Sequence, residues 1–132
     1  MDIKNIDEQL ETTLAQPSFI NELLAIIQSN KKAQEIRESL SEYHDNDIAE
    51  VIPLLQPEER KKLYRILGDE AVSDIFAYLD NVEEYIAELD NEKAADIIEE
   101  MDADDAIDVL SELDDERKKK LLMKIASGVL WK

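Results

Sequence analysis

Cysteine is absent from this sequence of 132 residues, which also has only two glycines and one histidine. The lack of cysteine excludes disulfides, thiolate metal sites and a cysteine nucleophile, and it fits a reducing compartment such as the cytoplasm. Gly68 and Gly128 are too few to build a phosphate-cradling loop or a dinucleotide-binding turn. His44 has no second histidine to complete a metal site, and a capping or solvated role suits it better. We therefore predict that the chain is not an enzyme.

Long apolar runs are absent as well. No segment reaches the roughly 18 uninterrupted apolar residues of a membrane-spanning helix, and the N-terminus has no basic start followed by an apolar run. A formal net charge of −18 opposes binding to nucleic acid phosphates and to anionic lipids, which require stripes of lysine and arginine. We therefore expect a cytoplasmic protein with no nucleic acid partner and no direct membrane insertion.

Basic residues are almost missing from one long stretch. Between Gly68 and Arg117 the sequence has twenty Asp and Glu residues and a single base, Lys93, while the rest of the chain is nearly neutral. Like charges at this density repel one another in a compact state. We therefore expect a counter-charge, which can be a divalent cation, a basic partner surface, or both.

A repeat dominates what the sequence does contain. A charged residue is followed by two apolar residues, two variable residues and another apolar residue. Seven copies start at intervals of 12, 12, 10, 12, 12 and 12 residues, at Glu50, Lys62, Asp74, Glu84, Asp96, Asp108 and Lys120. Apolar positions one, three and four residues apart make a single stripe on a helix. Each copy therefore predicts a short amphipathic helix.

Helix boundaries are part of the same repeat. In four copies an aspartate follows the last apolar residue, where its side chain can cap the next helix; these residues are Asp80, Asp90, Asp102 and Asp114. Pro57 and Gly68 lie at the corresponding boundaries of earlier copies. Pro53 lies within residues 48–55 and should shorten or kink the helix there, because its ring clashes with the preceding turn.

The predicted fold is all-α. Short helices with almost no linker must turn sharply and stack, as in a short α-solenoid, and no period-two alternation indicates a strand. We predict one domain, residues 1–132, built as a right-handed superhelical array of about 8–10 short amphipathic helices. Residues 35–125 carry the repeats, and residues 1–34 form a less regular helical segment. One helix should open at Pro17 and run through Ile27, and a second from about Lys32 to Tyr43.

The carboxylates are the best candidates for chemistry, and the densest group is at residues 102–108. If a helix begins near Ala103, Asp104 and Asp108 lie one turn apart on one face, with Asp105 beside them. This is not an EF-hand loop, because the required glycine is absent; magnesium suits the group better, since it takes one or two carboxylates and keeps several waters. Ordinary capping and helix-dipole roles also explain acids in a first turn, and they are the commoner explanation.

The segment Asp96–Leu113, together with His44–Ile52 and Pro57–Arg60, resembles the cytoplasmic N-terminal domain of the MgtE family of magnesium transporters. The resemblance extends over about residues 35–125. It implies a right-angled superhelix of short helices that is followed by paired CBS domains and a transmembrane pore. It also implies that magnesium bound between the N-terminal domain and the CBS domains holds the channel shut.

By position, the sensing acids of that family correspond to Asp74, Asp104 and Asp108, with Asp105 as an accessory ligand. The chain stops soon after Ile125, where a CBS pair would follow, so we expect an excised domain or a stand-alone relative that cannot transport ions. The resemblance implies Mg²⁺ as a weakly held cofactor shared with a partner domain. It implies the CBS and transmembrane domains of the same transporter as partners, and a homodimer formed through those domains is compatible with it.

Two other functions stay open. A short α-solenoid can be a protein interaction scaffold that presents an acidic face to a basic partner. The charge alone also suggests an acidic mimic of nucleic acid. Binding by a scaffold or a mimic should weaken in monovalent salt, whereas a sensor should respond to millimolar divalent ions at fixed ionic strength.

Overall fold

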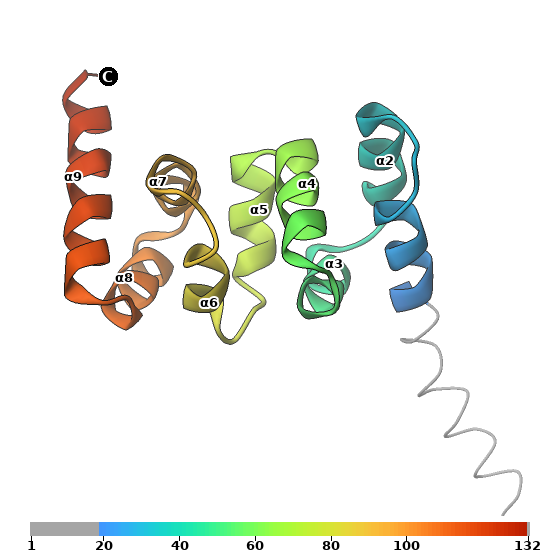
Figure 1. Cartoon of the computed structure of the whole chain (residues 1–132), viewed down its shortest axis with the longest axis horizontal. Coiled ribbons are helices and arrows are strands. Elements are labelled where there is room, and N and C mark those ends of the chain that lie inside the picture. Colours follow the sequence, from blue (N-terminus) through green and yellow to red (C-terminus); the bar gives the residue numbers. More distant parts are fainter. Residues whose placement is uncertain (1–18, 132) are drawn as a thin grey trace, which may run out of the picture.

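The computed structural model of the chain describes residues 19–131, with side chains through residue 127. Its helices follow in the order residues 19–27, α2 (Ala33–Leu40), α3 (Asp45–Val51), the 3-10 helix η1 (Ile52–Leu54), α4 (Pro57–Leu67), α5 (Asp69–Phe76), α6 (Val82–Ile86), α7 (Asn91–Glu100), α8 (Ala103–Glu112) and α9 (Asp115–Trp131). They succeed one another along the long axis of the molecule (Figure 1). No strand occurs within residues 19–131, and the all-α prediction is confirmed.

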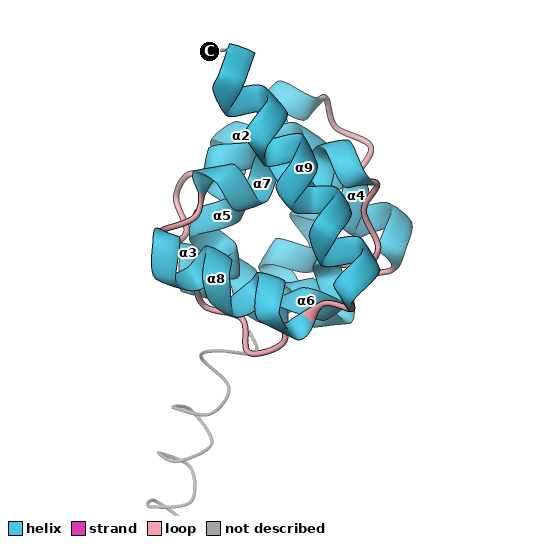
Figure 2. Cartoon of the chain, turned by 90° about the vertical axis from the view of Figure 1, so that its left-hand side faces the viewer, coloured by secondary structure: helices cyan, strands magenta, loops and turns pink. Residues whose placement is uncertain are grey.

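Packing is mainly between helices two places apart in the chain. α2 contacts α4, α3 contacts α5, α5 contacts α7, α6 contacts α8, and α7 contacts α9. This pattern winds the chain into a superhelix, and the view along the long axis shows the helices arranged around it (Figure 2). The predicted superhelical array of short helices is therefore confirmed.

The apolar stripes of the repeats form one continuous core. Tyr64 in α4 and Phe76 in α5 are both buried, and their rings meet edge to face with centroids 5.4 Å apart. Leu23 and Ile27 join the same core from the first helical segment. Burying a large apolar side chain stabilises a fold by roughly 1.5–3 kcal/mol. Burial of the apolar side chains at the repeat positions therefore stabilises the array.

Arginine side chains connect successive turns of the superhelix. The Arg37 guanidinium donates a 2.8 Å hydrogen bond from Nε to the carbonyl oxygen of Ile66, 29 residues later. The Arg117 guanidinium donates a 2.6 Å bond to the carbonyl oxygen of Leu89, 28 residues earlier. One superhelical turn therefore contains slightly more than two repeats. Both arginines therefore bond to backbone carbonyl oxygens within the scaffold and do not pair with the acidic surface.

Arg60 makes the most extensive connection. Its Nε donates to Glu88, 28 residues later, at 2.8 Å, and the two side chains form an ion pair. Its Nη1 donates to the carbonyl oxygen of Leu55 at 2.5 Å, and the guanidinium lies over the Tyr85 ring, 5.3 Å from its centroid. The hydrogen bond to Glu88 raises the pKa of Arg60. Arg60 is only 8% exposed and the Glu88 side chain is 24% exposed, so this partly buried ion pair joins η1, α4 and the turn after α6.

The region before the repeats departs from its predicted boundaries. The second helix, α2, is shorter than the predicted range at both ends, because Lys32 is extended and Tyr43 lies in a turn closed by its N–H bond to Leu40. Pro53 has the predicted effect, since α3 ends before it and the 3-10 helix η1 takes over. The first helical segment ends at residue 27 as predicted, whereas Pro17 lies outside the described residues.

Two junctions depend on single residues. His44 occupies the N-cap position of α3 with an exposed side chain, and the Asp47 carboxylate accepts a 3.4 Å hydrogen bond from its backbone N–H, which agrees with the predicted capping or solvated role. Gly68 separates α4 from α5 with φ at 90° and ψ at 163°. An L side chain rarely adopts that conformation. The abrupt turn between these two helices therefore requires glycine.

Two of the four predicted aspartate caps are formed. Asp90 and Asp114 each accept a 2.8 Å hydrogen bond from the backbone N–H three residues later. The prediction is wrong for Asp80, because α6 begins later and Asn81 takes its cap position. Asp102 occupies the cap position of α8, but its side chain makes no capping hydrogen bond. Its carboxylate is therefore available for another role.

Candidate functional site

The acidic junction is carried by α8, which begins at Ala103 as the sequence predicted. Val109 and Leu110 are buried and fix the helix against the core. The opposite side of α8 consequently faces solvent, with Asp104 and Asp108 exposed one turn apart and Asp105 half-buried. The ligation of a metal by these residues stays a prediction.

A cavity of about 430 Å³ lies between the end of α5, the start of α6 and α8; we call it the larger acidic cavity. Asp105 and Asp108 line it, and part of its wall is apolar, with Phe76 and Val109 among the residues there. Three further carboxylates and no base complete its charged lining; they belong to Asp80, Glu83 and Glu112. A cation, and not an anion, is therefore the charge that this cavity can receive.

A cavity of about 230 Å³, the smaller acidic cavity, shares Asp105 with the larger one. Its lining brings Asp74 of α5 together with Asp102 and Asp105 at the start of α8 and with Asp45 at the start of α3. Asp105 is therefore common to both cavities, with Asp74 on one side and Asp108 on the other. Asp104, the remaining predicted site residue, lines neither cavity.

Asp45 and Asp102 line the smaller acidic cavity although the sequence did not single them out as site residues. Asp102 was assigned to helix capping, and Asp45 is distant in the chain. A signal was nevertheless present, because Asp45, Asp74 and Asp102 are 29 and 28 residues apart. Arginine bonds connect successive turns across the same spacing. A search for acids at that period, in addition to the twelve-residue repeat, would have found both residues.

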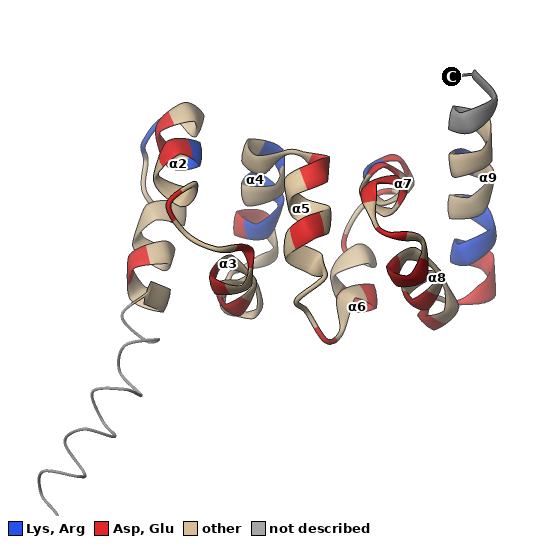
Figure 3. Ribbon diagram, turned by 180° about the vertical axis from the view of Figure 1, so that it is seen from behind, with Lys and Arg blue, Asp and Glu red and all other residues tan. Residues whose placement is uncertain are grey.

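The bases near these cavities are engaged elsewhere. Lys93, the only base of the acidic stretch, pairs with Asp69 at 2.5 Å. Acids of the stretch also act on each other: partial burial, followed by the nearby charges of Asp69 and Glu92, raises the pKa of Asp96. The ribbon in Figure 3 has acidic segments on α3, α5, α6, α7 and α8, whereas most basic ones lie on α2, α4 and α9. Among the described residues, every charged side chain that lines the two acidic cavities is thus a carboxylate.

The carboxylate oxygens of the two acidic cavities are the possible metal ligands at this site. Within the described residues, no group of three or more His, Asp or Glu side chains is arranged to hold a metal ion. The oxygen donors of both cavities nevertheless suit Mg²⁺, which commonly takes one or two carboxylates and keeps several of its waters. A second acidic surface could supply the remaining ligands.

Comparison with known proteins places this acidic superhelix in a family. The sequence model of the MgtE intracellular N domain matches residues 43–128. The chain belongs to the MgtE intracellular N-domain family. A solved structure, the crystal structure of the soluble part of a magnesium transporter, is similar to this MgtE N domain with a TM-score of 0.73 and 28% sequence identity. The similarity covers 83% of the chain and 44% of that protein's chain, which is less than half of its length.

The family match confirms the resemblance inferred from the sequence, and its bounds overlap most of the predicted residues 35–125. A comparison of the MgtE N domain with curated proteins gives no match. The family is defined by a domain of a transporter and not by a reaction, which agrees with the prediction of a non-enzyme. Among the helices of residues 19–131, none is long and apolar enough to cross a bilayer.

Proposed function

We propose that this MgtE N domain is the cytoplasmic magnesium-sensing domain of a magnesium transporter, and that it closes against the CBS domains of the same transporter when Mg²⁺ binds. The observation that carries the proposal is the adjoining pair of acidic cavities, lined by Asp74, Asp105 and Asp108 and by no base. Family membership and the similarity to the soluble part of a magnesium transporter support it. The transmembrane domain of that transporter would then respond to the closure.

Closure depends on charge. Two acidic surfaces repel one another, and unit charges 4 Å apart interact by about 4 kcal/mol at an effective dielectric constant near 20. A Mg²⁺ ion placed between one carboxylate of each surface attracts both carboxylates, each through a charge of two. The two carboxylates still repel one another, but over a longer distance. The ion therefore favours the closed arrangement, and its concentration sets the fraction of closed molecules.

The isolated domain should bind Mg²⁺ weakly, because each cavity offers only part of a coordination shell. Asp105 is the central ligand in this proposal, since it lines both cavities. Asp74 and Asp102 would complete the side facing α5, and Asp108 the side facing α6. The exposed Asp104 would contact an ion or a water from the partner side.

The deciding experiment follows Mg²⁺-driven compaction of the domain joined to its CBS domains, by small-angle scattering at fixed ionic strength. We expect two double variants, Asp74→Asn with Asp105→Asn and Asp104→Asn with Asp108→Asn, to need a higher Mg²⁺ concentration for compaction. Each removes two charges. If both variants compact at the same Mg²⁺ concentration as the native protein, the proposed sensing site is wrong.

The matched control is Asp90→Asn with Asp114→Asn. It also removes two negative charges from the acidic stretch, but at residues outside the proposed site. Both helix caps are kept, because asparagine caps a helix as well as aspartate does. We expect this control to compact as the native protein does. A loss equal to that of the site variants would mean that bulk charge, and not a site, drives closure.

A second function, an acidic scaffold for a basic partner, is favoured by one observation. The larger acidic cavity combines apolar side chains such as Phe76, Val82 and Val109 with five carboxylates. A basic amphipathic helix would satisfy both properties. Its binding should weaken steadily with monovalent salt, whereas magnesium sensing should respond to millimolar Mg²⁺ at constant ionic strength.

A further inference from the structure

The last helix of the array, α9, leaves apolar side chains uncovered. In every copy of the repeat two apolar residues follow the charged one. The second of them is at most 8% exposed in the six earlier copies, at Ile52, Tyr64, Phe76, Ile86, Ile98 and Leu110. The corresponding residue of the seventh copy, Leu122, is 44% exposed, and Met123 beside it is 63% exposed. α9 therefore has the apolar face of a repeat helix without a neighbour that covers it.

Packing between helices two places apart explains this exposure. α5 contacts both α3 and α7, and α7 contacts both α5 and α9. α9 contacts α7, but within residues 19–131 no later helix follows to cover its other side. Figure 2 looks onto this end of the array, with α8 and α9 in front. Repeat arrays generally end in a polar outer face, so two exposed large apolar residues here indicate a contact surface.

A shallow groove of about 390 Å³ runs along this uncovered side; we call it the α9 groove. Its lining residues are mostly three or four positions apart and so share one face of the helix; they are Asp115, Lys118, Lys119, Leu122, Met123 and Ala126. Among the described residues, no carboxylate forms an ion pair with Lys118 or Lys119. The α9 groove therefore suits a partner surface that combines apolar side chains with carboxylates.

The larger acidic cavity has this complementary composition. It combines apolar side chains, Phe76 and Val109 among them, with five carboxylates and no base. It also lies close to the α9 groove in the chain, because its last lining residue is Glu112 and the groove begins at Asp115. α9 cannot enter the cavity of its own chain, since the buried Leu121 holds it in the core. A second copy of the chain can supply the complement of each surface.

We propose that the α9 groove docks onto the larger acidic cavity of a second copy of this chain. A twofold axis would place the groove of each copy against the cavity of the other, so that both contacts form together. Lys118 and Lys119 would then lie among the carboxylates of the cavity, and Leu122 and Met123 against its apolar wall. Burial of the apolar side chains would favour association, and the charges would fix the orientation.

The net charge of −18 on each copy weakens this contact but does not prevent it. At physiological ionic strength, interactions between exposed charges are largely screened beyond about 8 Å, so the charges within the interface decide. Exposed ion pairs contribute little, and one groove with one cavity on each copy makes a small contact, so we expect a weak dimer. The contact needs no Mg²⁺. When it is measured without Mg²⁺, its failure is therefore distinct from a failure of the proposed magnesium sensing.

The test is sedimentation velocity of the whole chain without Mg²⁺, at physiological ionic strength and at protein concentrations up to about 1 mM, where a small contact can form. We expect the native chain to shift from monomer to dimer as its concentration rises. The groove variant, Lys118→Glu with Lys119→Glu, makes the α9 groove negative. The cavity variant, Asp80→Lys with Glu83→Lys and Glu112→Lys, makes the net charge of the cavity positive. Each variant alone should dimerise at least about tenfold more weakly, since like charges then meet in both contacts.

Mixing the two variants gives the sharpest result. In a dimer of one groove variant with one cavity variant, each groove meets a cavity of opposite charge. We therefore expect an equimolar mixture to restore the dimer that neither variant forms alone. Two variants that had merely lost their fold would not restore it.

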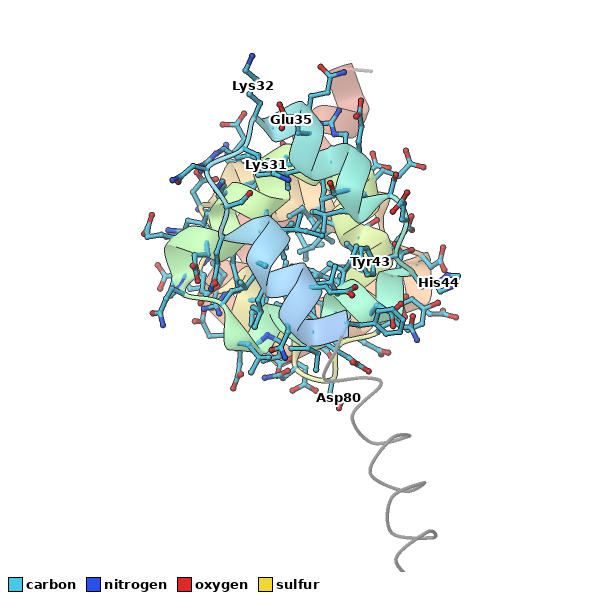
Figure 4. All side chains as sticks on the ribbon, turned by 90° about the vertical axis from the view of Figure 1, so that its right-hand side faces the viewer. Lys31, Lys32, Glu35, Tyr43, His44 and Asp80 are labelled. Atoms are coloured by element: carbon cyan, nitrogen blue, oxygen red, sulfur yellow. The ribbon has the colours of Figure 1, made fainter. Side chains whose placement is uncertain are left out.

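The charge control is Lys31→Glu with Lys32→Glu, which changes two exposed bases just before α2 and alters the net charge as much as the groove variant does (Figure 4). It should dimerise as the native chain does. Leu122→Ala with Met123→Ala should weaken the dimer without lowering the melting temperature, because both side chains are exposed. A native chain that stays monomeric, a control as weak as the groove variant, or a mixture that stays monomeric would overturn the proposal. Assemblies larger than dimers would overturn the twofold arrangement.

Discussion

Replacing Arg60 with methionine is expected to loosen the connection between turns of the superhelix. Methionine keeps much of the apolar stem, so the change removes mainly the guanidinium. That group bonds to Glu88 and to the carbonyl oxygen of Leu55, and it lies over the Tyr85 ring. The variant therefore leaves a carboxylate and a carbonyl without their partner at the junction of η1, α4 and the turn after α6.

The magnitude follows from burial. Removing one partner of a buried ion pair costs about 3–5 kcal/mol, because the other charge is left without a partner. The Glu88 side chain is 24% exposed, so water can solvate part of its charge. We therefore expect a loss of about 3 kcal/mol for Arg60→Met. Glu88→Gln should cost about 1–2 kcal/mol, since glutamine can still accept a hydrogen bond from Arg60.

Urea unfolding followed by far-ultraviolet circular dichroism measures both variants. Arg60→Met should lower the midpoint and leave the slope unchanged. The control is Lys61→Met, which removes a positive charge from the next, half-buried position and should change stability by less than about 0.5 kcal/mol. A loss below about 1 kcal/mol for Arg60→Met, or an equal loss for the control, would refute a structural role for the ion pair.

Three further predictions concern the backbone, the core and pH. Gly68→Ala should lower stability by about 1–3 kcal/mol in thermal unfolding, because φ is 90° although a Cβ would meet no atom within 4 Å; a neutral result would show that the junction relaxes. Leu121→Ala should cost about 2–5 kcal/mol in urea unfolding, whereas Leu122→Ala should be close to neutral, because these neighbours are 0% and 44% exposed; similar losses would contradict the packing of α9. Asp96→Asn should stabilise the chain at neutral pH, because burial and nearby acids raise the pKa of Asp96 and folding therefore disfavours its ionised form. Between the ordinary pKa of 3.8 and the raised pKa of the folded state, the native chain binds more protons than the unfolded chain, so its stability falls as pH rises through this range. The stability gained by Asp96→Asn should therefore vanish below pH 3.8. Equal urea midpoints for Asp96→Asn and the native chain at neutral pH would disprove the unfavourable effect of the Asp96 charge.

The repeat predicted most helices because it encodes both the buried stripe and the helix end. α7 follows the pattern fully, with Asp90 as a formed cap and with Ile97 and Ile98 buried. The displaced cap at Asp80 falls where the interval contracts to 10 residues, between the copies at Asp74 and Glu84. The missing residues shorten α6 and displace its cap, so Asp80 loses the role that its counterparts have.

Other features depend on contacts that the repeat does not specify. Arg60 follows two acids in the first turns of α4 and has the sequence features of a solvated base. It is buried because Glu88 and the end of η1 converge on it in the fold. Asp102 has the same place in the repeat as Asp90, but only Asp90 makes a capping bond. The position in the repeat therefore predicts where a residue lies on its helix, and tertiary packing decides what its side chain contacts.

The superhelical period explains how acids that are spread along the sequence come together in one region of the surface. A turn of 28 or 29 residues places residues from every second or third helix on the same side of the array. Arginines at this spacing bond to carbonyl oxygens and so lose their effect on the surface charge. Asp45, Asp74 and Asp102 recur at the same spacing and line one cavity. These arginines are thereby used within the scaffold while the acids gather at its surface, and the partner domain and shared cation that we propose would relieve the resulting repulsion.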